Sequence, residues 1–428
     1  MTLLSLAAEC YRARDFAGAR QVLESMIEVD PGDLIAHDNC ARACLEMGDY
    51  AAAIPHFMEL VKDGRPDVQA WVKLGAAALA DQQHDLASMA LGTAMDLAPD
   101  DPVVLHTYAS LFATLLLDDA AIALYKRAYK LRPGYTDPMV GHAFCLLRQG
   151  KYRRGWELFE KRWDLTNGTR EYHGISEWKG ERCGMVVLRS EQGFGDTLQF
   201  LRYIPLVAER AVEVFVDCHR LMRRIVERIP GVTGVVDTGT TPPAADYQTG
   251  LMSLPHIFGT TLENIPPPVR FYVPGAIVQG LPRIGLCWAG GSRPNEPAAH
   301  AIDKRRSITF ESLAPIMAVP GVEWVSLQRE DNRLPGPIDH AADFYDTARL
   351  IQSLDAVVTV DTAVCHLAAS MGIPTLLLNR FDTCWRWLLE REDSPWYLSL
   401  RIFRQRALGE WGLVIERVAA AVREMVGG

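Results

Sequence analysis

LDAVVTVDTAVCHLAASMGIPTLLL, residues 354–378, decides the fold of the C-terminal half of this 428-residue chain. The apolar runs at 356–360 and 375–378 predict two buried strands. The small residues at 363–371 predict a helix between them, and Gly372 is placed to end it. Because the connecting loops are short and the strands are apolar throughout, the segment predicts a βαβ unit in a parallel sheet that is covered on both faces.

A polar turn follows the first of these strands. Asp361 lies at the carboxyl end of the strand, and the amides of Thr362 and Ala363 begin the helix. Free amides and the helix dipole favour an anion such as a phosphate at this position. Turns of this kind also occur without a ligand in parallel α/β folds, so the pattern alone leaves both interpretations open.

The motif DTAVCHLAA at 361–369, followed by GIP at 372–374, resembles the D-T-x-x-x-H-L-A-A-x-x-G-x-P signature of the bacterial ADP-heptose–lipopolysaccharide heptosyltransferases. Similar segments occur in the tetratricopeptide-linked transferases related to the O-linked N-acetylglucosamine transferase. Those enzymes have the GT-B fold, and their turn holds the diphosphate of a nucleotide-sugar donor. The resemblance implies that Asp361, Thr362 and Ala363 bind the donor. His366 either contacts the phosphate or sugar, or is a core histidine bonded to a carbonyl.

Length and composition predict a globular protein of two or three domains. The chain is 49% hydrophobic and 23% charged, and it has no apolar run near the ~20 residues of a membrane helix. Its N-terminus lacks the basic region of a signal peptide and predicts a helix instead. The nine cysteines include no CxxC pair, and the closest two, Cys40 and Cys44, have helical spacing. Buried thiols in a reducing cytoplasm explain them better than disulfides or a zinc site, so we expect a cytoplasmic, non-transmembrane protein.

Residues 1–166 repeat with a period of 34. Two small positions twelve apart in each unit let paired helices approach closely, and prolines at the ends of units stop the helices. Trp71, Leu74 and Gly75 match the opening W-x-x-L-G of the tetratricopeptide repeat, so the pattern predicts an α-solenoid of five such repeats. The small residues are Ala7, Ala41, Gly75, Ala109 and Ala143 in one series and Ala19, Ala53, Ala87, Ala121 and Gly155 in the other.

Charge is unevenly distributed along this array. Residues 1–120 carry 7 basic and 19 acidic side chains, whereas residues 121–166 carry 10 basic and 4 acidic ones. The acidic part argues against nucleic-acid binding, because it cannot neutralise phosphates. Its charge indicates either a solvated helical surface or a site for a basic partner. Such arrays usually bind a polypeptide, and the alternative is that this one only holds the protomers of a homo-oligomer together.

Strands and helices alternate after residue 170 and predict two doubly wound lobes, at 175–270 and 276–428, joined by a proline-rich linker at 266–274. Together with the resemblance, this predicts an α-solenoid followed by an α/β GT-B fold of two Rossmann-like lobes. Ligands in such folds bind in a cleft at the carboxyl ends of both sheets.

A glycine-bearing loop follows the first strand of the first lobe and contains Gly193, Gly195 and Asp196. A lone G-x-G is equally consistent with a tight turn. In the heptosyltransferase-like family the matching loop ends in an aspartate that points at the acceptor, so the resemblance makes Asp196 our candidate general base. The alternative is that Asp196 caps a helix starting at Thr197.

Three cations, Lys304, Arg305 and Arg306, precede a helix in the second lobe. The resemblance implies that at least one neutralises the donor β-phosphate, and the alternative is a solvated basic loop. Trp288 and Gly290 open the second lobe, and we expect both at the donor because the small residues there allow the backbone to approach a ligand. Gln328 ends a strand, where it either contacts the nucleoside or is an ordinary polar residue.

No D-x-D follows a strand, so we expect no bound metal and no cofactor beyond the nucleotide-sugar co-substrate. The sequence thus predicts a metal-independent, inverting glycosyltransferase that acts on an acceptor hydroxyl. The array and a compact first lobe favour a polypeptide acceptor over a lipid. The alternatives are a non-catalytic scaffold with a degenerate transferase half and a sugar-nucleotide epimerase of GT-B fold. A dehydrogenase is disfavoured because no G-x-G-x-x-G follows a first strand.

Overall fold

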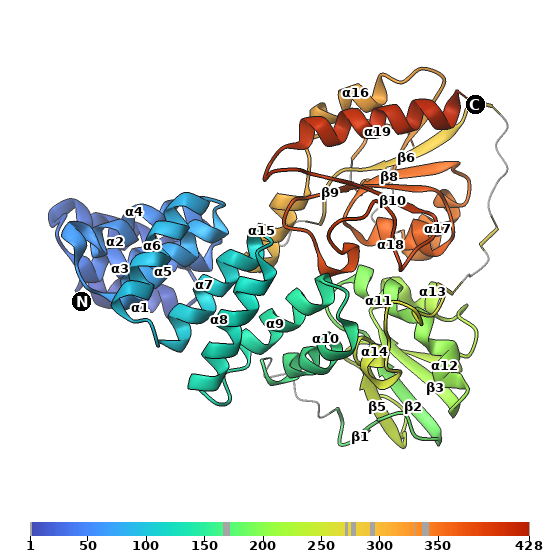
Figure 1. Cartoon of the computed structure of the whole chain (residues 1–428), viewed down its shortest axis with the longest axis horizontal. Helices are drawn as coiled ribbons and strands as arrows, with labels where there is room; N and C mark the ends of the chain where they lie inside the picture. Colours follow the sequence, from blue (N-terminus) through green and yellow to red (C-terminus); the bar gives the residue numbers. More distant parts are fainter. Residues whose placement is uncertain are drawn as a thin grey trace. The chain divides into compact units, whose positions relative to one another are not determined.

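The computed structural model divides into two compact units, which we describe separately (Figure 1). The first comprises Met1–Cys145 and Gly291–Arg305, and the second comprises Leu146–Gly290 and Arg306–Gly428. The domain boundaries expected from the sequence stay predictions, and part of the expected linker, 270–272, lies outside the described residues. The structure describes residues 2–165, 172–269, 273–274, 280–291, 296–329, 331–335 and 342–427.

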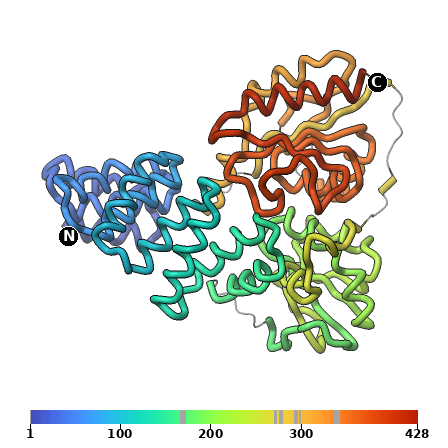
Figure 2. The backbone as a smooth tube through the Cα atoms, in the orientation of Figure 1, coloured from blue at the N-terminus to red at the C-terminus, as the bar shows by residue number. Residues whose placement is uncertain are grey.

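The N-terminal part of the chain forms successive helical hairpins, and the backbone trace in Figure 2 shows their alternating direction. This confirms the predicted tetratricopeptide array. Four hairpins lie in the first unit, and the fifth begins there and ends in the second unit. The helices are α1 (Leu3–Arg12), α2 (Phe16–Val29), α3 (Leu34–Glu46), α4 (Tyr50–Leu60), α5 (Val68–Ala80), α6 (His84–Leu97), α7 (Pro102–Thr114), α8 (Asp118–Leu131), α9 (Asp137–Arg148) and α10 (Tyr152–Phe159).

The small residues of the repeat lie where paired helices touch. Ala41, Ala53, Ala87 and Ala121 are all fully buried. At Gly75, an added Cβ would lie 2.5 Å from Cγ of Leu91 on the partner helix α6. Small side chains at these positions therefore set the spacing within each hairpin, as the sequence predicted.

The 34-residue period also recurs in the residues that cap the helices and in the turns between paired helices. Asp33, Asp67 and Asp101, spaced by 34 residues, each accept hydrogen bonds from two amides at the start of α3, α5 and α7. One residue in each turn between paired helices has a positive φ, although only two of these residues are glycines. These positions are Arg14, Gly48, Gln82, Leu116 and Gly150.

The described residues of the second unit form two five-stranded parallel sheets. The first sheet has the order β1-β5-β2-β3-β4. Its strands pair in parallel and are interspersed with helices along the chain, which matches the predicted α/β class. They are β1 (Ser176–Glu177), β2 (Cys183–Arg189), α11 (Phe194–Phe200), α12 (Ile204–Ala208), β3 (Ala211–Cys218), α13 (Arg223–Val226), β4 (Gly234–Asp237), β5 (Tyr247–Gly250) and α14 (Leu254–Ile257).

The second sheet has the order β10-β9-β8-β6-β7. All residues of β8 and β9 are buried, so both faces of the sheet centre are covered, as the apolar runs predicted. The apolar side of α19 packs on one face with α16, and α18 contacts β8 and β9. The elements are β6 (Arg283–Cys287), α16 (Ala314–Met317), β7 (Glu323–Ser326), α17 (Phe344–Ile351), β8 (Ala356–Val360), α18 (Ala363–Ser370), β9 (Thr375–Asn379), β10 (Leu400–Arg404) and α19 (Trp411–Val426). Helix α15 (Pro297–Arg306) follows β6 in the chain but belongs, up to Arg305, to the first unit.

Helix α10, the last of the array, packs within the second unit through an aromatic cluster. The Trp156 ring lies 5.0 Å from that of Trp385, 6.0 Å from that of Phe200 and 6.4 Å from that of Trp396. Tyr152 also accepts a hydrogen bond from the Trp396 indole at 2.9 Å. The cluster joins α10 to α11, which follows β2, and to the segment between β9 and β10. Among the described helices, none is long and apolar enough to cross a membrane.

Candidate functional site

Each sheet has a point where the strand order reverses. In the first sheet this point lies between β2 and β5, and in the second it lies between β6 and β8. Ligands of parallel α/β sheets bind beyond the carboxyl ends of the strands at such points. The segments predicted to bind ligands lie there, because 193–196 follow β2, 288–290 follow β6, and 361–363 follow β8.

The turn between β8 and α18 presents the start of a helix without a side-chain cap. Thr362 is the N-cap residue with extended backbone (φ −135°, ψ 175°), but its side chain accepts no capping hydrogen bond. Its hydroxyl instead lies 3.3 Å from Thr359 Oγ1 and 3.7 Å from Cys287 Sγ, inside the sheet edge. The first amides of α18 therefore have no cap from Thr362, which suits an anionic ligand.

Of the three predicted phosphate-binding cations, Arg306 lies at this turn. Its Nη1 donates to the Asp361 carbonyl at 2.7 Å. Lys304 instead lines a pocket of the first unit together with Asp49. Arg305 also belongs to the first unit, whereas Arg306 belongs to the second. The structure thus distinguishes three adjacent cations that the sequence treated as equivalent.

The loop after β6 is held by Gln328. Its Oε1 accepts from the amides of Trp288 at 3.2 Å and Ala289 at 3.0 Å. The Gly290 amide donates to Ser307 Oγ at 3.1 Å, and the Trp288 side chain is buried in the core of the second sheet. Gln328 and Trp288 therefore shape the loop, and a contact of either with a nucleoside stays a prediction.

His366 is a buried, neutral histidine. Its Nδ1 lies 2.9 Å from the Tyr397 hydroxyl, and its ring stacks on Trp387 with centroids 5.4 Å apart. Burial lowers the pKa of His366 to about 3, although Asp361, whose Oδ1 lies 3.9 Å from Nε2, acts in the opposite direction. The partner is a hydroxyl and not the carbonyl that the core-histidine interpretation expected. A neutral ring can exchange hydrogen bonds with a sugar or phosphate but cannot neutralise charge.

Gly195 allows two segments to approach closely. An added Cβ would lie 2.8 Å from His366 Cδ2 and 3.6 Å from Ala363 Cα. Helix α11 accordingly packs against α18 within the second unit. The sequence led us to expect a cleft between the loop at 193–196 and the turn at 361–363. Gly195 instead lies against His366, so no side chain fits at Gly195 unless its neighbours move.

Asp196 uses both carboxylate oxygens within the protein. Oδ2 accepts from the Gly193 amide at 2.8 Å, and Oδ1 pairs with Nη2 of Arg386. Helix α11 begins at Phe194 and not at Thr197, so Asp196 stabilises the helix start from the third helical position. Asp196 therefore does cap a helix, but from inside its first turn and not from the position before Thr197. The role of Asp196 as a general base stays a prediction.

Arg386 is a site residue that the sequence did not predict. Besides Asp196, it contacts Gln199 Oε1 and Cys384 Sγ, the latter at 3.1 Å. Burial opposes its charge, but the Asp196 carboxylate and other neighbours outweigh this, so the pKa of Arg386 is raised. The sequence feature that could have identified Arg386 is its position between two tryptophans, Trp385 and Trp387. A cation in such apolar surroundings needs a charged or polar partner.

Two buried donors near this ion pair have no hydrogen-bond partner among the described residues. They are Nε2 of Gln199, which is fully buried, and Nε1 of Trp387, whose ring stacks on His366. Buried donors without partners are uncommon in folded proteins and are frequent where a ligand binds.

Two known protein families match separate parts of the chain. Residues 11–77 match the tetratricopeptide repeat family, and residues 342–381 match glycosyltransferase family 9 (heptosyltransferase). The latter segment contains α17, β8, α18 and β9 and therefore the turn at 361–363. The resemblance to repeat-linked glycosyltransferases is thus confirmed.

Individual relatives cover different parts of the chain. Protein FlbA of Caulobacter vibrioides is 25% identical over 448 residues, which cover 92% of this chain and 73% of FlbA. MamA of Desulfovibrio magneticus RS-1 is 21% identical with a TM-score of 0.34, over 38% of this chain and 92% of that one. YrrB, described as a TPR protein with an unusual peptide-binding site, is 16% identical with a TM-score of 0.32, over 38% of this chain and 84% of its own.

Proposed function

We propose that this protein is a glycosyltransferase of GT-B type that moves a sugar from a nucleotide-sugar donor to an acceptor hydroxyl. One observation carries the proposal. The heptosyltransferase match falls on the turn at 361–363, where α18 begins without a side-chain cap and Arg306 lies against the Asp361 carbonyl. Helix amides and a guanidinium together form the kind of site that binds a diphosphate.

In this proposal the donor diphosphate binds at the start of α18. Arg306 neutralises the β-phosphate, which carries the developing charge when the bond to the sugar breaks. The nucleoside lies toward the ends of β6 and β7, beside the loop that Gln328 holds. Because amides and a cation stabilise the leaving group, the reaction needs no metal ion, and direct attack by the acceptor inverts the anomeric carbon.

Asp196 is our candidate for the base that removes the proton from the acceptor hydroxyl. Its Oδ1 pairs with Arg386, so the acceptor must take the place of the guanidinium at that oxygen. The two oxygens of the Asp196 carboxylate then have separate roles. The Gly193 amide keeps Oδ2 in place, and Oδ1 accepts the proton. Arg386, once released, remains close to the turn and adds positive charge to the donor site.

The array is proposed to bind a polypeptide acceptor in the cytoplasm. A pocket of about 460 Å³ in the first unit combines apolar side chains such as Leu4 and Ala7 with the donors Asn39 and Arg42. Its composition suits an apolar side chain flanked by backbone carbonyls, which accept from amide and guanidinium groups. An amide-rich polypeptide is consistent with this chemistry.

Titration calorimetry with UDP, ADP, GDP and CMP tests the donor site. We expect one diphosphate to bind the unaltered protein, and we expect Arg306→Gln to weaken that binding by about tenfold or more, the usual value of one charge-assisted hydrogen bond. Lys304→Gln, a neighbouring cation on the same helix, is the matched control and should bind as the unaltered protein does. No binding at millimolar nucleotide, or equal losses in both variants, would contradict the proposal.

One observation favours a second candidate, a scaffold that binds a nucleotide without turnover. Both oxygens of Asp196 are already engaged, and Gly195 lies against His366. Incubation with a panel of nucleotide sugars distinguishes the two functions. A transferase releases nucleoside diphosphate, and faster when an acceptor is present, whereas a scaffold binds the nucleotide and releases none.

A further inference from the structure

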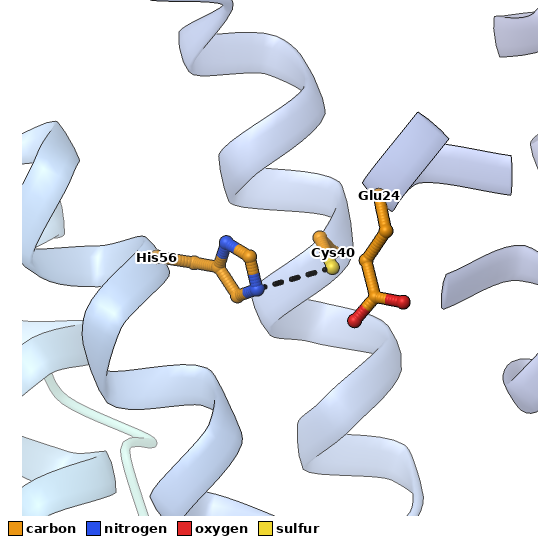
Figure 3. Close-up of side chains that lie close together, drawn as sticks. All are labelled: Glu24, Cys40 and His56. Atoms are coloured by element: carbon orange, nitrogen blue, oxygen red, sulfur yellow. Dashed lines mark hydrogen bonds between the residues drawn. The ribbon is translucent and has the colours of Figure 1, made fainter. Parts of the chain in front are cut away.

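Three side chains from three different helices meet in the first unit. Glu24 of α2, Cys40 of α3 and His56 of α4 each bring one potential ligand atom within 4.8 Å of the other two. Figure 3 shows His56 and Glu24 approaching Cys40 from opposite sides. The Cys40 Sγ lies 3.3 Å from His56 Nε2, and Cys40 is fully buried.

A chain of hydrogen bonds fixes which nitrogen of His56 is free to bind. His37 Nε2 lies 3.1 Å from the Pro31 carbonyl, which only accepts, so this nitrogen carries a proton. With the proton of His37 on Nε2, the other nitrogen, Nδ1, accepts from His56 Nδ1 at 3.0 Å. His56 Nε2 is therefore unprotonated, and its lone pair faces the Cys40 sulfur.

Histidines that bind metals usually have this arrangement. The coordinating nitrogen is unprotonated, and the other donates to a partner that fixes the tautomer and the ring orientation. His37 is thus placed to orient a ligand without being one itself.

We propose that Glu24, Cys40 and His56 bind a zinc ion within the array. Sulfur, imidazole and carboxylate are the ligand types that zinc prefers, and Zn–S and Zn–N bonds of tetrahedral geometry place S and N about 3.6 Å apart. The present separation of 3.3 Å needs a change of only a few tenths of an ångström. On binding, the Cys40 S–H bond is broken, a zinc–sulfur bond forms, and the proton leaves to solvent.

Hydrogen bonding alone does not explain why Glu24 belongs to this cluster. The chain from Cys40 through His56 and His37 ends at the Pro31 carbonyl without involving it. Arg20 holds Glu24 through Oε1 at 2.7 Å, so Oε2 is the oxygen that we assign to the ion. Two anionic ligands, a thiolate and a carboxylate, balance the charge of a divalent cation.

The test uses the full-length, untagged protein after dialysis against a chelator. We expect one zinc ion per chain in a chelator-competition titration. We expect cobalt, as a probe in place of zinc, to give the near-ultraviolet thiolate-to-metal charge-transfer band of a cysteine-bound ion. The cobalt spectrum needs no variant, so its absence alone would overturn the proposal.

Variants assign the ligands. Cys40→Ser and His56→Gln should each weaken zinc binding by at least about 100-fold, and His37→Ala by about 10- to 100-fold through loss of orientation. Cys145→Ser is the matched control, because Cys145 is also a buried cysteine of the same unit and lies outside the cluster. Circular dichroism checks that each variant is folded. Zinc binding that survives unchanged in folded Cys40→Ser and His56→Gln would place the ion elsewhere and overturn the assignment.

Discussion

The carboxylate of Asp196 and the guanidinium of Arg386 form an ion pair between positions 190 residues apart in the chain. Asp196 lies in the first turn of α11, after the first sheet's β2, and Arg386 lies after β9 of the second sheet. Their side chains are only 17% and 10% exposed. Removal of one partner from such a pair leaves a buried charge uncompensated, which costs about 3–5 kcal/mol in known cases. The pair therefore both holds the two segments together and occupies the oxygen that the proposed reaction needs.

Asp196→Asn removes the charge and keeps the size of the side chain. If Asp196 is the base, the rate of sugar transfer should fall by about 10²- to 10⁴-fold. Nucleoside diphosphate affinity should stay within a few-fold, because Asp196 does not lie on the donor turn. Steady-state kinetics over a range of pH and calorimetry measure the two effects.

Arg386→Lys provides the comparison for this variant, because it keeps the cation but loses the planar guanidinium. Because it keeps the Asp196 carboxylate, it should retain much more of the transfer rate than Asp196→Asn does. Equal loss of donor affinity and rate in Asp196→Asn would instead show that Asp196 acts only by positioning Arg386.

Gly195→Ala should destabilise the second unit. The added methyl group would lie 2.8 Å from His366 Cδ2, so α11 and α18 must separate or His366 must move. Overpacking of this kind costs about 1–3 kcal/mol, and a lower melting temperature in thermal unfolding is the expected result. Gly412→Ala in α19 is the control, because an added Cβ there meets no atom within 4 Å. A Gly195→Ala variant as stable as Gly412→Ala would contradict the close contact.

His366 should make the protein less stable in mild acid. Its pKa is lowered to about 3 by burial, whereas the unfolded value is about 6.5. Above about pH 6.5 both states are neutral, and the residue contributes no pH dependence. Between about pH 6.5 and 3 only the unfolded state binds the proton, so the unfolding free energy falls by up to about 1.4 kcal/mol per pH unit.

His366→Gln removes the titratable imidazole. Between about pH 6.5 and 4, the unfolding free energy of this variant should therefore fall less than that of the unaltered protein. Melting temperatures of both proteins across this range measure the difference, since all other groups titrate in both. Parallel curves would indicate that His366 is protonated in the folded state.

The pocket of the array should matter for the acceptor and not for the donor. Arg42→Ala combined with Leu4→Ala removes one donor and one apolar side chain from its lining. We expect slower transfer to a polypeptide acceptor and unchanged donor hydrolysis. Arg127→Ala removes an exposed cation of α8 that does not line the pocket and serves as the control. Undiminished acceptor transfer in the double variant would leave the array with a role in oligomerisation or stability.

Features carried by local pattern were predictable from the sequence. The repeat period predicted the five hairpins, and the apolar run placed β8 at 356–360 because a strand covered on both faces is almost entirely apolar, with Thr359 as its single polar residue. Strand β5 was not predicted, since Tyr247-Gln-Thr-Gly250 has neither an apolar run nor alternation, although it pairs with β2. Its place in the sheet comes from the two strands beside it.

Pairings between distant residues were not predictable. The sequence around Asp196 gives no sign that its partner is Arg386. The three adjacent cations at 304–306 are equivalent in the sequence, and only the folded structure shows that Arg306 donates to the Asp361 carbonyl. The cluster around Cys40 was missed for a related reason. Its members are separated by 16 residues and lie on three helices, whereas zinc motifs are recognised by ligands close together in sequence.

The aromatic cluster around Trp156 gives the protein an intrinsic optical signal. Indole rings 5.0 and 6.4 Å apart couple electronically, and Trp385 and Trp396 lie at these distances from Trp156. The neighbouring Phe200 and Tyr152 keep water away from the rings, so their emission should be blue-shifted and their near-ultraviolet circular dichroism strong. Any movement that separates the segment following β2 from the segment following β9 must break these edge-to-face contacts. Ligand-driven opening or closing can therefore be followed by tryptophan fluorescence without attaching a dye.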